Sequence, residues 1–135
     1  MRAEAHLHPL SVEECLRLLE SHLPRVGRLA LPDPNGPVIL PVNYVVDRGA
    51  IVFRTAAGTK LDAAVVHDVA GFEVDTLDVT WQEGWSVLVQ GRLEEVTDPE
   101  ELTRLAELPL HPWLGDDLPH LVRLLPSAIS GRRIA

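Results

Sequence analysis

The sequence predicts a mainly β protein: a six-stranded antiparallel barrel, closed or partly open, with two or three short helices. Residues 25–98 carry the turn signals of antiparallel strands, among them the hairpin pair Asn35-Gly36. Apolar residues at helical spacing mark the segments 11–22 and 98–108. A barrel is favoured over a flat sandwich because closure removes exposed strand edges. The length of 135 residues fits a single domain, 1–135.

The first helix is predicted over 11–22, after a flexible arm at 1–10. Ser11 and Glu14 form a capping box, in which each side chain can bond the backbone N–H of the other residue. The apolar residues that follow repeat every three or four positions, and Pro24 ends the pattern. Those apolar residues are Val12, Cys15, Leu16, Leu19 and Leu23.

Alternating apolar and polar residues predict the strands. Pro41 lacks a backbone N–H, which places its strand at an edge or a bend, and Gly91 indicates a bulge. A short helix is expected to start at Thr59. The predicted strands cover 26–31, 37–46, 50–55, 69–76, 85–96 and 121–125, with a loop at 77–84 and a basic tail at 130–135.

The second helix is predicted over 98–108, with Asp98 as the cap and Pro99 at the first helical position. The segment 109–119 carries three prolines and has no regular period. Trp113 lies in this segment, where it is hard to bury within one subunit, so a contact with a partner chain is expected.

The charge balance limits the function classes. The chain has 12 Lys+Arg against 20 Asp+Glu, a formal net charge of −8. Nucleic-acid-binding proteins and peripheral membrane proteins normally present a basic face, so neither class is expected. Cys15 is the only cysteine, which excludes an intrachain disulfide and a thiolate zinc site, and the histidines show no metal-ligand spacing. With neither a signal peptide nor a membrane span in the pattern, we expect a cytoplasmic protein without a metal site.

The segment 51–61 has the residues of a phosphate site. Arg54 and Thr55 end a strand, and Thr59 and Lys60 begin the next helical turn after Gly58. A guanidinium, an ammonium and the unpaired N–H groups of a helix N-terminus together hold a phosphate monoester. Lys60 is the only lysine in a chain with eleven arginines, which makes it an unexpected choice. The alternative is that both cations are solvated charges beside a loop.

Two further segments combine apolar and polar groups. Pro41, Val42, Asn43 and Tyr44 offer backbone and polar side-chain groups between apolar neighbours, as a planar ring requires. The alternative is a bent edge strand with Tyr44 in the core and its hydroxyl bonded. Trp85 either packs over a ligand or fills the core.

These residues give the chain a family resemblance. It resembles the pyridoxamine 5′-phosphate oxidase-like family, and within it the short bacterial flavin-binding split-barrel proteins. The resemblance covers about residues 11–134, and the segments Phe53-Arg54-Thr55 to Lys60-Leu61 and Gly84 to Val87 carry it most specifically.

The resemblance implies a split β-barrel that forms a homodimer and binds FMN between its two subunits. Residues matching Arg54, Thr55, Thr59 and Lys60 hold the FMN phosphate in such proteins, and the strand matching Pro41–Tyr44 lies along the isoalloxazine ring. Trp85 and Ser86 match a motif close to the cofactor. Pyridoxamine phosphate oxidases bind their substrate through a C-terminal Arg-Leu-His type motif that the residues 131–135 do not match, which argues against vitamin B6 oxidation.

Two functions follow from the resemblance. The first is an FMN-dependent oxidoreductase acting on a small molecule, in which the flavin carries the redox chemistry and no protein residue is catalytic. The second is a non-catalytic carrier or sensor of a flavin or of the deazaflavin F420.

Overall fold

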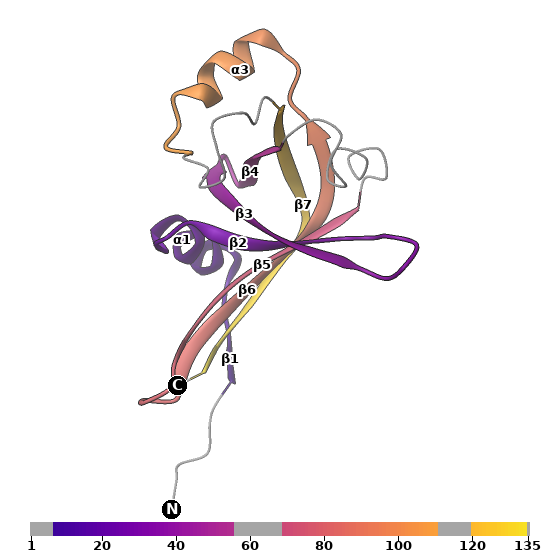
Figure 1. Ribbon diagram of the computed structural model, residues 1–135. Helices are drawn as coiled ribbons and strands as arrows, with labels where there is room; N and C mark the ends of the chain where they lie inside the picture. Colours follow the sequence, from indigo (N-terminus) through magenta and orange to yellow (C-terminus); the bar gives the residue numbers. More distant parts are fainter. Residues whose placement is uncertain (1–6, 56–68, 111–119, 135) are drawn as a thin grey trace, which may run out of the picture.

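The structure is a computed structural model, described here for residues 7–55, 69–110 and 120–134. Figure 1 shows the helix α1 against the side of a curved sheet and the helix α3 at its upper end. The elements are, in chain order, β1 (Leu7–Pro9), α1 (Val12–Ser21), β2 (Val26–Leu31), β3 (Val38–Asp47), β4 (Ala50–Thr55), β5 (Ala70–Asp78), β6 (Glu83–Glu95), α3 (Pro99–Ala106) and β7 (His120–Ile134).

Six of the strands close into an antiparallel barrel. Their order is β7-β4-β3-β2-β5-β6, and β6 pairs again with β7 to complete the ring. The predicted fold class is therefore confirmed. The strands β5, β6 and β7 run on below the barrel as a long ribbon (Figure 1), and β1 pairs with the far end of β7 there.

The helix α1 begins as its sequence predicts. The Ser11 hydroxyl accepts a hydrogen bond from the Glu14 N–H at 3.2 Å, and the Ser11 N–H donates to the Glu14 carboxylate at 3.4 Å. Cys15 and Leu19 lie on the face of α1 that packs against the barrel, and both are fully buried.

Two predictions about the ends of the chain were wrong. The arm at 1–10 contains a strand, because Leu7, His8 and Pro9 pair with Ile134, Arg133 and Arg132. The last strand continues from 121–125 through the expected basic tail, since β7 reaches Ile134. Pro126 does not stop it, because the ladder shifts register there.

The register shift is the bulge that Gly91 predicted. Gln90 pairs with Ala128 and Gly91 pairs with Pro126, which leaves Ser127 as the extra residue. A bulge is a position where a strand tolerates a proline without a ladder N–H. The expected loop at 77–84 is shorter than predicted, because β5 extends to Asp78 and β6 starts at Glu83.

The helix α3 packs on the outside of the barrel. Leu105 and Leu110 join the buried residues Val45, Val52 and Leu121 in a second apolar cluster beside the main core. Pro99 stands in the first turn as predicted, while the Asp98 side chain makes no capping hydrogen bond.

An ion-pair network fixes α3 to the end of β3. The Arg104 guanidinium donates to both carboxylate oxygens of Asp47, at 2.8 and 2.9 Å, and to Glu101 at 2.6 Å. These guanidinium bonds lower the pKa of Asp47, with burial opposing the effect. The Arg104 hydrogen bond likewise lowers the pKa of Glu101.

We predict that Asp47→Asn destabilises the fold by about 1.5–3 kcal/mol near neutral pH, the range for a lost charge-assisted hydrogen bond. A lowered carboxyl pKa stabilises the folded state above its unfolded value of 3.8 and loses that contribution as the pH falls below it. Urea unfolding at neutral and acidic pH measures both effects. The difference between wild type and variant should shrink in acid, and a constant difference would contradict the assignment.

No helix in the described ranges has the length and apolar character needed to span a bilayer. The expected short helix after Thr59 and the segment with Trp113 lie outside the described residues.

Candidate functional site

The strand pairing decides which predicted site residues share a face. Successive side chains of a strand point to opposite faces of the sheet. Tyr44, Phe53 and Val87 belong to the core inside the barrel, whereas Val45 and Val52 lie outside it under α3. By alternation, the outer face carries Pro41, Asn43, Arg54 and Ser86, and the inner face carries Val42, Tyr44, Thr55 and Trp85.

Tyr44 is a core residue. Its side chain is 1% exposed, and its hydroxyl donates to the Leu19 carbonyl at 2.7 Å. Its ring packs edge-on against the Phe72 ring, with 5.0 Å between the ring centroids. Burial raises the pKa of Tyr44 to about 12. The structure therefore supports the alternative given for this residue, and its phenol is not available to a ligand.

Asn43 and Arg54 are neighbours on the outer face. Tyr44 pairs with Phe53, so the next residue outward on each strand is Asn43 on β3 and Arg54 on β4. Arg54 is half-buried, with its backbone paired to Leu121 of β7. A guanidinium and an amide thus lie side by side where these two strands part.

Pro41 lies on the part of β3 that the sequence predicted to be at an edge or a bend. Within the described residues, β3 pairs with β2 from Val38 to Asn43 and with β4 only from Tyr44 to Asp47. Pro41 is exposed on the outer face. Among the described residues, the ring of Pro41 and an edge backbone therefore lie together, next to Asn43.

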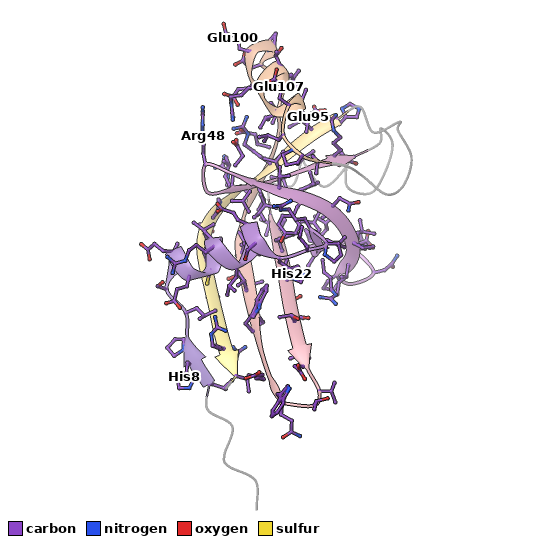
Figure 2. All side chains as sticks on the ribbon, turned by 90° about the vertical axis from the view of Figure 1, so that its left-hand side faces the viewer. His8, His22, Arg48, Glu95, Glu100 and Glu107 are labelled. Atoms are coloured by element: carbon purple, nitrogen blue, oxygen red, sulfur yellow. The ribbon has the colours of Figure 1, made fainter. Side chains whose placement is uncertain are left out.

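Thr55 shares the strand end with Arg54 but points the other way. It is 4% exposed and pairs with His120 of β7, whose imidazole Nδ1 contacts the Glu95 carboxylate. Figure 2 shows Glu95 at the α3 end of the barrel. Thr59 and Lys60 lie outside the described residues, so their part in the phosphate site stays a prediction.

Trp85 and Ser86 lie on β6, away from Arg54. The Trp85 ring packs against the main core and meets His22 edge-on at 5.4 Å, and Figure 2 shows His22 at the end of α1. Trp85 also lines a groove of about 550 Å³ with Thr76, Leu77 and Arg133. The Ser86 side chain points to the opposite, outer face, where Ser86 pairs with Arg132.

One chain does not bring all of these residues to one small site. The strands β2 and β5 separate β3 from β6, so Asn43 and Ser86 are three strand spacings apart, about 14 Å around a convex wall. A flat ring lying along Pro41 and Asn43 cannot also touch Ser86 of the same chain.

The surface between these two groups carries a charge cluster that sequence reasoning missed. Arg28 of β2 reaches Glu73 at 2.9 Å and Asp75 at 3.4 Å, both on β5. The strand register aligns Arg28 with Pro41 on one side and with Glu73 on the other. The alternation in Phe72-Glu73-Val74-Asp75 was the available signal, since it puts both carboxyl groups on the outer face.

Within this cluster, Glu73 is the group whose proton binding is altered. Burial, the largest cause, and the neighbouring Asp75 together raise the pKa of Glu73 to about 7, against the opposing effect of Arg28. Glu73 therefore binds a proton at a pH where an ordinary glutamate is ionised.

A family model described as pyridoxamine 5′-phosphate oxidase matches residues 11–133 of this chain. The chain belongs to the pyridoxamine 5′-phosphate oxidase family. The resemblance seen in the sequence is thereby confirmed. A relative from Mycobacterium tuberculosis, the uncharacterised protein Rv0080, is 36% identical over 132 residues, which cover 93% of this chain and 84% of Rv0080.

Two solved structures of flavin-nucleotide-binding proteins have the same architecture. The FAD-binding protein from Mycobacterium smegmatis is 39% identical, with a TM-score of 0.78 over 93% of this chain and 96% of that one. A FAD-binding protein from Mesorhizobium loti is 27% identical, with a TM-score of 0.77 over 98% of this chain and 99% of that one.

Proposed function

We propose that this protein is a flavin-dependent oxidoreductase that binds FMN between two copies of the chain and acts on a small molecule. The observation that carries the proposal is the similarity, over almost its whole length, to a protein that binds a flavin nucleotide. Bound flavin would supply the electron-accepting ring, so no protein acid or base is needed.

The outer face of the barrel supports this assignment. Arg54, with Lys60 beyond it in the sequence, would hold the phosphate, and Pro41 and Asn43 would lie along the ring. Because Tyr44 and Thr55 are buried inside, we assign them the support of these strands instead of side-chain contacts to the flavin.

The separation of the two residue groups supports the homodimer as part of the proposal. A flavin on β3 of one copy would be completed by Ser86 of the partner subunit, and each copy would contribute to both sites. Two sites between two copies is the arrangement that a two-fold axis generates. The cytoplasmic location stays a prediction.

A second flavin nucleotide is a candidate for the cofactor. Two similar structures are of FAD-binding proteins, so FAD competes with FMN for the proposed site. The deazaflavin F420, held by a carrier without turnover, is the alternative that sequence reasoning left open.

We predict that purified protein is yellow, or becomes so when FMN is added. Titrations of the flavin-free protein with FMN, FAD, riboflavin and F420 identify the preferred cofactor from absorbance and fluorescence. Anaerobic addition of NADH or NADPH then separates an oxidoreductase, whose flavin absorbance bleaches, from a carrier. A protein that binds none of the four compounds would overturn the proposal.

A further inference from the structure

The cluster of Arg28, Glu73 and Asp75 lies midway between the two groups of residues that the proposed flavin sites use. On the outer face, Arg28 neighbours Pro41 of β3, and Asp75 pairs with Ser86 of β6. In a two-fold dimer, each copy presents the same patch to the other. If each flavin joins β3 of one copy to β6 of the other, the surface between β3 and β6 faces its own symmetry copy.

This surface has the composition of a subunit contact. Ile39 is 64% exposed and Leu88 is 37% exposed, and both border a groove of about 350 Å³ that also contains Arg28 and Glu73. Exposed apolar side chains grouped around a few charges mark interaction surfaces. Because the patch holds both signs of charge, the guanidinium of one copy can face a carboxyl group of the other.

Two copies of this surface nevertheless carry too many carboxyl groups to pack against each other unless some of these groups bind protons. Each copy brings two carboxyl groups and one guanidinium within ion-pair distance of each other. Two such patches would gather four carboxyl groups around two guanidinium groups, away from water. The net charge of −8 adds a long-range repulsion between the copies.

We propose that Arg28, Glu73 and Asp75 form the centre of a two-fold subunit interface, where each carboxyl pair keeps one proton so that the two patches can meet. This inference rests on the dimer of the proposed function. It adds a regulation: assembly, and with it retention of the flavin between the subunits, weakens as the pH rises.

The direction of this pH dependence follows from the groups that surround Glu73. On the outer face, the charged groups near it are Arg28 on β2, Asp75 on β5 and, two strands away on β7, the exposed Arg132. The facing positions of β6 and β3 are uncharged and comprise Ser86, Leu88, Gln90, Ile39 and Pro41.

Docking of the partner removes water from this pair, and desolvation disfavours the ionised carboxyl group. In the single chain the pKa of Glu73 is already about 7. The dimer therefore binds protons that the separated copies release above neutral pH. By linkage, the dimer is strongest in mild acid and loses strength as the pH rises through and beyond neutrality.

Sedimentation of the full-length, flavin-free chain measures the dimer dissociation constant at each pH. We expect it to rise by at least about tenfold between roughly pH 6 and pH 8.5, with up to two protons released per dimer. Glu73→Gln keeps a neutral group that can bond Asp75, so this variant should stay tightly dimeric at every pH. The control, Glu100→Gln, changes an exposed carboxyl on α3 (Figure 2) and should keep the wild-type dependence.

The following results would contradict the inference. A dimer whose dissociation constant ignores pH, or a Glu73→Gln variant that keeps the wild-type dependence, overturns the inference and leaves flavin binding untouched. A chain that is monomeric at every pH overturns the interface as well. Flavin titration, measured separately, shows whether the proposed cofactor site fails or survives in each case.

Discussion

Phe72→Ala is expected to destabilise this protein by about 3–5 kcal/mol, the range for truncating a buried aromatic ring. Phe72 is fully buried, and its ring contacts Tyr44 edge-on. It also covers Gly27 of β2, where an added Cβ would lie only 2.2 Å from the Phe72 Cζ. Since domains of this size are stable by about 5–15 kcal/mol, the loss would remove a large share of the total.

The contact with Gly27 gives this prediction a sharper form. Gly27→Ala alone should cost about 1–3 kcal/mol, because the ring has no space into which to retreat. In the double variant, the new methyl group enters the volume that the ring has left. The double variant should therefore be more stable than the sum of the single changes implies. Urea unfolding of the four proteins measures this coupling, and strict additivity would contradict the proposed packing.

Local signals were enough to predict the elements whose stability is local. The capping box of Ser11 and Glu14 starts α1 with bonds between residues three positions apart. The alternation in β4 places Ile51 and Phe53 in the core because a strand has a period of two. Elements made by pairing with a distant strand gave no such signal. Three residues at Leu7–Pro9 have no pattern of their own and form a strand because the end of β7 lies beside them.

The candidate site was predictable as residue types but not as a surface. The segments with Pro41, Asn43 and Arg54 could be placed on one continuous outer face only once the register was known. For Tyr44 the sequence left two placements open, and the structure supports the core one, in which the hydroxyl donates to the Leu19 carbonyl. The cluster at Arg28 joins residues 45 and 47 positions apart, and only the pairing of β2 with β5 brings them together.

The phosphate preference of the flavin site should depend on Arg54 and Lys60. Removing one charge-assisted contact costs about 1.5–3 kcal/mol, so Arg54→Ala or Lys60→Ala should weaken FMN binding by about ten- to a hundredfold. The double variant should lose more than either single variant. We expect less than the product of the two losses, because both cations would act on one phosphate group.

Riboflavin separates this role from a general effect on the fold. It has the ring of FMN without the phosphate, so the single variants should bind riboflavin as the wild type does while losing their preference for FMN. Arg92→Ala is the matched control, since it removes an exposed arginine from β6 without touching β4. Equal losses for FMN and riboflavin would show that Arg54 supports the strand instead of the phosphate. Arg54→Lys should restore part of the preference, because the charge returns without the two-pronged geometry of the guanidinium.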